Sequence, residues 1–296
     1  MKIVVTIPAY NEENTIASVI ASVKNVMSAT KYKYKIHVLD DGSRDKTAEI
    51  ARAAGAVVFS HPKNYGLAEA FRTEIKKALE NNADIIVHTD ADGQYPAEDI
   101  PKLIAEIENG SDIVLGSRFL GKIEYMPFMK KLGNRAFSKA ISHITGTRIT
   151  DGQTGFRAFT KDVAKLDIIS NHTYTQEQII RAVRNKFKIK EIPIYAKKTR
   201  ASKLMKSHPL LQPFEYAAKA WINIFRIYRD FEPLKFFGYF GTAFLLSGFA
   251  IGLWLLSILF NTGRIGHIPA SILAMLLMVA GIQVWLFGFL ADMQRK

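Results

Sequence analysis

The chain has 296 residues, with 40 Lys and Arg against 27 Asp and Glu and a formal net charge of +13 at pH 7. This length allows one large domain or two small ones, and a hydrophobic content of 48% excludes a disordered chain. The absence of cysteine excludes a disulfide framework, a thiolate zinc site and a cysteine nucleophile.

Strand and helix patterns alternate over residues 1–120. Short β-branched or apolar runs predict strands at Lys2–Ile7, Ile36–Leu39, Ala56–Phe59, Asp84–His88 and Asp112–Leu115. The segments between them have the apolar spacing of helices: Glu12–Met27, Asp45–Ala54, Leu67–Leu79 and Ala97–Glu108. This alternation predicts an α/β, Rossmann-like domain with a mostly parallel sheet and helices on both faces. The first strand starts without the basic segment of a signal peptide, so we expect the domain to stay in the cytosol.

Acidic motifs directly follow three of these strands, at Pro8–Glu13, Asp40–Thr47 and Asp90–Gln94. The carboxyl ends of parallel strands form one edge of the sheet, where ligands bind. Asp90 and Asp92, with Gln94 two residues further, are hard oxygen ligands that Mg²⁺ and Mn²⁺ prefer alongside water and substrate phosphates. Taken alone, the Asp-x-Asp pair is equally well explained as a cap of the following helix.

Basic residues gather in two blocks after the fifth strand. Residues 118–148 hold seven Lys and Arg and one acid, and residues 186–229 hold eleven and two. Such blocks suit phosphates and an anionic bilayer surface, at about 1 kcal/mol per charge near the membrane. A nucleic-acid-binding patch is the competing interpretation, and the apolar tail argues against it.

The last 61 residues hold only four charged groups, Arg264, Asp292, Arg295 and Lys296. Residues 236–260 and 268–291 carry no charge, and each stretch is long enough to cross a hydrocarbon core of roughly 30 Å as a helix. A short polar turn around Gly263 and Gly266 separates them. We therefore predict a two-helix transmembrane hairpin, with a pair of buried core helices as the alternative.

The flanking charges predict how this hairpin is oriented. Four basic residues closely precede the first span and two follow the second, whereas Arg264 alone lies in the turn. The positive-inside rule places the large domain and the C-terminus in the cytoplasm. Residues 210–228 have an amphipathic pattern that suits the headgroup plane, or else packing on their own domain. Gly248 and Gly252 form a G-x-x-x-G motif, a candidate contact for a homo-oligomer.

Together, the three acidic motifs resemble those of the family 2 glycosyltransferases with the GT-A fold. Further segments resemble the polyprenyl- or dolichyl-phosphate sugar synthases of the dolichol-phosphate mannose synthase and bactoprenol glucosyltransferase type: Gly116–Arg118, Asn134–Ser138, Asp151–Arg157, Glu177, Glu191–Ile194 and Arg200–Leu204. The similarity covers almost the whole chain. The sequence departs from the family at Leu67 and Ala68, where many members carry Lys-Gly. Any phosphate contact that the family's lysine makes is therefore absent here or is made by another residue.

The resemblance implies a role for each matched residue. Nucleotide-sugar contacts are expected from Pro8, Ala9, Tyr10, Glu12, Asp40, Asp90, Ala91, Asp92, Arg200 and Lys203. Asp92 and Gln94 would ligate Mg²⁺ or Mn²⁺ on the sugar diphosphate. The lipid phosphate would be held by Arg118, Arg135 and Ser138. The implied catalytic set is Asp90, Asp92, Arg118 and Arg135.

The implied reaction is inverting transfer of a sugar from a nucleotide-sugar to polyprenyl (dolichyl or undecaprenyl) phosphate at the cytosolic membrane face. UDP-glucose, UDP-N-acetylglucosamine and GDP-mannose all stay open as donors. One alternative is a processive polysaccharide synthase, but its Q-x-x-R-W motif is absent from this sequence. The other is a non-catalytic membrane scaffold or flippase-associated module, against which the intact site residues argue.

These inferences divide the chain into four parts. We expect a cytosolic GT-A catalytic domain (1–208), an amphipathic juxtamembrane helix (209–235), two transmembrane helices (about 236–260 and 268–291) and a cytosolic tail (292–296). The expected partners are the nucleotide-sugar, the polyprenyl phosphate and the lipid bilayer of the cell membrane, and not nucleic acid. A homo-oligomer through the transmembrane helices stays an open alternative.

Overall fold

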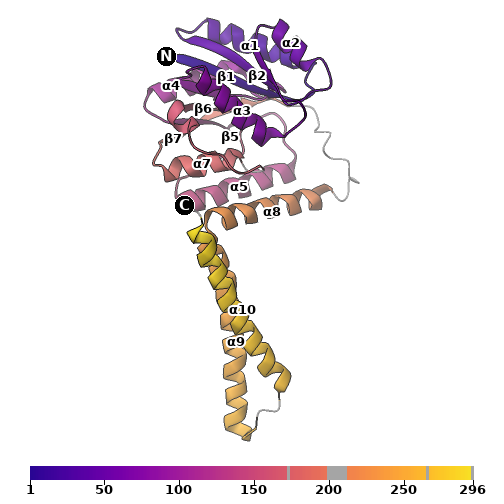
Figure 1. Ribbon diagram of the computed structural model, residues 1–296, viewed down its shortest axis with the longest axis vertical. Helices are drawn as coiled ribbons and strands as arrows, with labels where there is room; N and C mark the ends of the chain where they lie inside the picture. The colour runs from indigo at the N-terminus through magenta and orange to yellow at the C-terminus, as the bar shows by residue number, and fades with distance from the viewer. Residues whose placement is uncertain (172–173, 199–211, 265–266, 295–296) are drawn as a thin grey trace. The chain divides into compact units, whose positions relative to one another are not determined.

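A computed structural model describes residues 1–171, 174–198, 212–264 and 267–294. The chain forms two compact units, residues 1–220 and residues 221–296. The first unit contains a layered α/β domain, and the second contains two long apolar helices (Figure 1).

A seven-stranded sheet in the order β3-β2-β1-β4-β6-β5-β7 forms the centre of the first unit. The strands are β1 (Lys2–Ala9), β2 (Lys33–Asp40), β3 (Val57–Ser60), β4 (Ile85–His88), β5 (Ile113–Ile123), β6 (Arg157–Thr160) and β7 (Ile189–Ala196). Only β6 runs antiparallel to its neighbours β4 and β5, and the other pairs are parallel. The predicted α/β fold with a mostly parallel sheet is thus confirmed.

Helices cover both faces of this sheet (Figure 1). One face carries α1 (Ile16–Ser28), α2 (Thr47–Ala53), the short 3₁₀ helix η1 (Ala97–Asp99) and α4 (Ile100–Glu108). The other carries α3 (Leu67–Glu80), α6 (Lys161–Ala164) and α7 (Tyr174–Arg184), with α5 (Phe128–Thr145) packed against α7.

The side chains of β1 show why the two faces differ. Ile3, Val5 and Ile7 belong to the main hydrophobic core together with α1 and α4. Successive side chains of a strand point to opposite faces, so Thr6 points the other way, where its hydroxyl lies 3.4 Å from Nδ1 of His88. The α3 and α7 face therefore contains buried polar groups beside its apolar ones.

The structure differs from the predicted elements at several places. Helix α1 begins at Ile16 instead of Glu12, because the preceding turn is hydrogen-bonded to the loop after β2. Strands β6 and β7 were not among the predicted strands. Strand β6 has only four residues and begins with a buried arginine, Arg157, so it lacks an apolar signal.

Among the described residues, two helices are long and apolar enough to cross a membrane, and both belong to the second unit: α9 (Pro233–Thr262) and α10 (Ile268–Met293). Helix α8 (Gln212–Phe231) precedes them and spans the boundary between the units. A Cβ atom added at Gly241 would lie 2.8 Å from the carbonyl oxygen of Gly281, and one added at Gly248 would lie 2.8 Å from that of Ala274. Small residues let the two backbones meet closely. Gly248 is thus used inside the hairpin, whereas Gly252 faces open space.

Candidate active site

A cavity of about 310 Å³ opens at the carboxyl edge of the sheet. Its walls come from the loop after β4, from the middle of β5, from the loop before β6, and from helices α3, α5 and α7. The lining residues are Leu67, Asp90, Asp92, Gln94, Tyr95, Arg118, Lys130, Asn134, Gln153, Gly155, Tyr174 and Thr175. Four of the predicted site residues therefore meet in one cavity: Asp90, Asp92, Gln94 and Arg118.

Asp90 and Asp92 form the acidic side of this cavity. A Cβ atom added at Gly155 would lie 2.8 Å from Oδ1 of Asp90, so the carboxylate occupies the space that a larger residue would fill. Oδ1 of Asp92 accepts a hydrogen bond of 2.9 Å from the backbone N–H of Gln94. Asp92 reaches solvent, but desolvation by the surrounding protein, and then the charge of Asp90, raise its pKa to about 6.

The metal-binding prediction is consistent with the chemistry of these oxygens. Asp92 and Gln94 both line the cavity, and their oxygens are hard ligands. Within the described ranges, no three His, Cys, Asp or Glu side chains form a metal cluster. A divalent ion here would take its other ligands from a bound diphosphate and from water, which is typical of Mg²⁺ and Mn²⁺.

Arg118 forms the buried basic side of the cavity. Its Nε and Nη2 donate to the two oxygens of Asp151 at 2.7 and 2.8 Å, and its backbone N–H donates to the same carboxylate at 3.0 Å. Burial alone would lower the pKa of Arg118. The neighbouring Tyr95 and Asp151 outweigh this effect, so that the net pKa lies above its usual value. Arg118 is therefore charged and fixed in orientation, because its guanidinium is clamped by a bidentate pair.

Helix α5 presents Lys130 and Asn134, one turn apart, to the same cavity. Desolvation and the charge of Arg118 lower the pKa of Lys130. The predicted lipid-phosphate residues Arg135 and Ser138 do not line this cavity. Arg135 lies over the ring of Phe119, 5.5 Å from its centroid, and the Ser138 hydroxyl is buried and accepts from the N–H of Gly152 at 3.0 Å.

Five of the predicted nucleotide contacts lie at the neighbouring ends of β1 and β2 and do not line the cavity: Pro8, Ala9, Tyr10, Glu12 and Asp40. The register of the two strands pairs Ala9 with Asp40. A hydrogen bond of 2.8 Å from the N–H of Glu12 to Thr47 Oγ1 joins the segments that follow the two strands. Within the second of these segments, the N–H of Ser43 donates to Asp40 Oδ1 at 3.0 Å.

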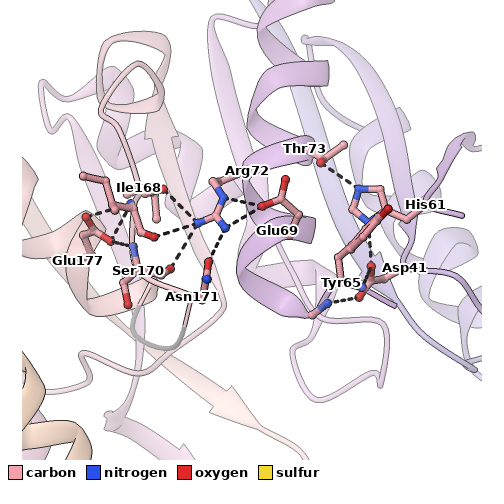
Figure 2. A network of polar contacts seen from close by, with 12 residues as sticks. Asp41, His61, Tyr65, Glu69, Arg72, Thr73, Ile168, Ser170, Asn171 and Glu177 are labelled. Carbon is pink, nitrogen blue, oxygen red and sulfur yellow. Dashed lines mark hydrogen bonds and ion pairs between the residues drawn. The ribbon is translucent and has the colours of Figure 1, made fainter. Parts of the chain in front are cut away.

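Asp41 organises the loop that leads to the cavity residue Leu67 (Figure 2). Its carboxylate accepts from the N–H groups of Tyr65 and Gly66 at 2.9 and 2.8 Å, and it lies 2.7 Å from Nδ1 of His61. The other ring nitrogen of His61 lies 3.0 Å from the hydroxyl of Thr73 on α3. The start of α3 is thereby fixed to the end of β2.

A second contact network on α3 holds the segment before α7 (Figure 2). The Arg72 guanidinium donates to the carbonyl of Ile168 at 3.1 Å and to Asn171 Oδ1 at 2.6 Å, while also pairing with Glu69. Glu177 accepts from the N–H groups of the intervening residues, including that of Ser170 at 2.7 Å. Helices α3 and α7, which supply Leu67, Tyr174 and Thr175 to the cavity, are thus joined through one segment.

Some predicted residues are placed elsewhere or not described. Ala91 is buried next to the acidic pair. Arg200 and Lys203 lie outside the described residues. Eight lining residues had no predicted role: Leu67, Tyr95, Lys130, Asn134, Gln153, Gly155, Tyr174 and Thr175. The spacing of Lys130 and Asn134 by four residues on one helix is the only sequence signal that indicates a shared face.

The comparisons with known proteins agree with this geometry. Residues 4–166 match the family described as "Glycosyl transferase family 2". The UDP-N-acetylglucosamine–dolichyl-phosphate N-acetylglucosaminyltransferase of Methanococcus voltae is 35% identical over 215 residues, which are 64% of this chain and 82% of that protein. The dolichyl-phosphate hexose transferase of Haloferax volcanii is 35% identical over 193 residues, 64% of this chain and 80% of that protein.

A solved structure shows the same fold. Glucosyl-3-phosphoglycerate synthase from Mycobacterium tuberculosis, in complex with Mn²⁺, UDP and phosphoglyceric acid, matches with a TM-score of 0.58 and 22% identity, over 74% of this chain and 75% of that chain. At this identity, the likeness confirms the GT-A-like arrangement of sheet and helices.

Proposed function

The chain belongs to glycosyl transferase family 2, and from this premise we propose that it transfers one sugar from a nucleotide-sugar to the phosphate of a membrane polyprenol. One observation carries the proposal: a single cavity has carboxylates on one side and two cations on the other. The names of the relatives, which refer to dolichyl phosphate, support the choice of a lipid phosphate as the acceptor.

The acceptor needs little activation by the protein. A phosphate monoester has a second pKa near 6, so it is largely dianionic at pH 7 and already a nucleophile. One of its oxygens attacks the anomeric carbon, the bond from that carbon to the donor's β-phosphate oxygen breaks, and the nucleoside diphosphate leaves with the electron pair. The main task of the enzyme is to bring two anions together in line.

Arg118 and Lys130 are suited to hold the acceptor phosphate. Both are cationic, both line the cavity, and the bidentate pairing of Arg118 with Asp151 fixes the orientation of its guanidinium. Lys130 also supplies an ammonium group to the cavity that Leu67 lines, and Leu67 stands at a position where many members of the family carry a lysine. Arg135 and Ser138, predicted from the resemblance, stay competing candidates for the same role.

The donor diphosphate belongs at Asp92 and Gln94. When bound there, Mg²⁺ or Mn²⁺ would neutralise the diphosphate and stabilise it as a leaving group. Asp90, fixed against Gly155, faces the same space. The strand ends with Pro8, Ala9, Tyr10, Glu12 and Asp40 are the proposed nucleoside site, and Arg200 and Lys203 are proposed to contact the diphosphate. A uridine or guanosine donor carrying glucose, N-acetylglucosamine or mannose fits this proposal.

The two apolar helices are proposed to anchor the domain where the lipid phosphate is presented. The charges that flank them favour a cytoplasmic catalytic domain and C-terminus. Cysteine labelling of Asn261→Cys in the last turn of α9 and of Ser22→Cys on α1, in sealed membrane vesicles of known orientation, tests this topology. Only the second site should react with a membrane-impermeant thiol reagent from the cytoplasmic side.

The reaction itself is tested by incubating the purified full chain with radiolabelled nucleotide-sugars, polyprenyl phosphate and Mn²⁺. The proposal predicts one sugar per lipid, released as a lipid-linked product. A polymer would instead support the processive synthase, and the absence of any product with every donor would support the non-catalytic scaffold. Lys31→Ala, a change at an exposed side chain before β2 and outside the cavity, is the control for handling of the membrane protein.

A further inference from the structure

Arg157, the first residue of β6, is the largest fully buried side chain in the described part of the chain, with 0% exposure. Burying a guanidinium costs free energy unless charges and hydrogen bonds compensate it. Burial also lowers the pKa of Arg157 to about 10, which still leaves it charged at pH 7. Because this burial is costly, the question is which groups compensate the charge of Arg157 and what the charge contributes to the site.

The hydrogen bonds of Arg157 join two walls of the cavity. Its Nη1 donates to the carbonyl of Thr175 and to Gln178 Oε1, both at 3.0 Å, and its Nη2 donates to the carbonyl of Thr154. Thr175 lines the cavity from α7, and Gly155, which follows Thr154, lines it from the opposite segment. All three acceptors are neutral, and Nε has no partner among the described residues.

The charge of Arg157 must therefore be balanced at longer range, and the groups whose ionised forms favour it are Tyr174, Tyr95, Asp151 and Asp90. Burial raises the pKa values of both tyrosines well above 10, so they are neutral at pH 7. Asp151 is already paired in bidentate fashion with Arg118. Glu74, another buried carboxylate, is paired with His88, which lies opposite Arg157 in the sheet. Asp90 is then the neighbouring carboxylate without a described ion pair.

The pairing of β4 with β6 places Asp90 near Arg157, which is evidence separate from the electrostatics. Strand β4 pairs with β6 so that His88 lies opposite Arg157, two residues before Asp90. The carboxylate of Asp90 rests against the Cα of Gly155, next to the carbonyl that Arg157 holds. The described salt bridges include none for Asp90, and no hydrogen-bonded cation compensates its charge.

We propose that Arg157 is a positioning residue. It balances the charge of Asp90 from inside the fold, and its hydrogen bonds hold the Thr154–Gly155 wall of the cavity in a fixed position relative to the Tyr174–Thr175 wall. The inference rests on the proposed function, because it assigns Arg157 to the site for the donor diphosphate. Without this buried charge, Asp90 would repel an anionic donor.

Two substitutions separate charge from packing. Arg157→Met removes both the charge and the hydrogen bonds, whereas Arg157→Lys keeps the charge but cannot bridge the same three acceptors. The measurement is calorimetric binding of UDP and of GDP, each with Mn²⁺, to the full chain in the absence of lipid. We expect binding about tenfold weaker in Arg157→Met and restored to within about threefold in Arg157→Lys. Phe159→Leu, a buried change on the same strand that alters no charge, is the control and should bind as the unmodified chain does.

Melting temperatures of all three variants are measured in parallel. Equal loss of binding in the Met and Lys variants, unchanged binding in Arg157→Met, or an equal loss in Phe159→Leu at the same melting temperature would each overturn the proposal. If the unmodified chain binds a nucleoside diphosphate but transfers no sugar to polyprenyl phosphate, the proposed function fails while the role of Arg157 is still decided by binding.

Discussion

The two sides of the carboxyl edge are stabilised in different ways. At the ends of β1 and β2, the buried acids Asp40 and Asp41 are bound by backbone N–H groups and a histidine. Around β5 and β6, a buried arginine, Arg118, is bound by a buried carboxylate. A carboxylate that accepts hydrogen bonds from backbone N–H groups holds loops in place. A buried ion pair instead holds a charged side chain in the position where a ligand can contact it.

The difference locates the chemistry. The acids of the first side organise the surroundings of the proposed nucleoside site, and the charges of the second side face the cavity where the two phosphates are proposed to meet. The antiparallel strand β6 brings its first residues to the same edge as the ends of the parallel strands. This reversal puts Asp151 and Gly155 next to Arg118 and Asp90.

The largest effect is expected at Asp92. Asp92→Asn keeps the shape of the side chain but removes the charge that holds a divalent ion, so we expect kcat/KM for sugar transfer to fall about 10³-fold. The melting temperature should not fall, because the raised pKa of Asp92 means that its charge does not stabilise the fold at neutral pH. Transfer within tenfold of the unmodified chain would contradict the metal assignment.

A comparison of Asp151→Asn with Asp41→Asn tests the contrast between the two sides. Asp151→Asn leaves the buried Arg118 without its counter-charge, and we expect a loss of about 3–5 kcal/mol in the free energy of unfolding. Asp41→Asn keeps one acceptor oxygen for its N–H donors, so a smaller loss of about 1.5–3 kcal/mol is expected. Urea denaturation of both variants measures the difference, and equal losses would remove the contrast.

Gly155→Ala should move Asp90 without changing any charge. The added methyl group would lie 2.8 Å from Oδ1 of Asp90, which forces the carboxylate or the loop to shift. We expect kcat to fall about tenfold to 100-fold, because small displacements in an active site cost that much. Gly252→Ala, where no atom lies within 4 Å, is the matched control and should keep full activity.

The smallest predicted effect is a pH dependence of metal binding. The pKa of Asp92 is raised to about 6, so the carboxylate takes up a proton as the pH falls through 6 and loses its affinity for the ion. Mn²⁺ binding followed by electron paramagnetic resonance should be about tenfold weaker at pH 5 than at pH 7. For the metal-free protein the sign is opposite: the raised pKa favours the folded state at low pH, and this contribution is lost as the pH rises through 6.

The first side of the edge could be predicted from the sequence. Its strands are β-branched runs of usual length, and the residues that follow each strand reach the edge wherever the strand ends. Pro8, Asp40 and Asp90 were placed correctly at strand ends for this reason. The two apolar helices of the tail could also be predicted, because a long uncharged stretch is compatible with few structures other than a long apolar helix.

The second side could not be predicted in the same way. Arg118 and Asp151 are 33 positions apart, and no local pattern indicates that they pair. Adjacent residues of a helix point about 100° apart, so the choice between Asn134 and Arg135 depends on how α5 is rotated about its own axis. That rotation is set by tertiary packing, and it turns Lys130 instead of Arg135 toward the cavity.

The choice between Lys130 and Arg135 gives the most direct test of the central claim, that the cavity holds the acceptor phosphate opposite the donor. The measurement is the KM for polyprenyl phosphate in Lys130→Ala and Arg135→Ala, with Lys131→Ala as the control for charge on the same helix. The account predicts a rise of about tenfold or more in Lys130→Ala, with unchanged binding of the nucleoside diphosphate. A rise confined to Arg135→Ala, with Lys130→Ala behaving like the Lys131→Ala control, would contradict it.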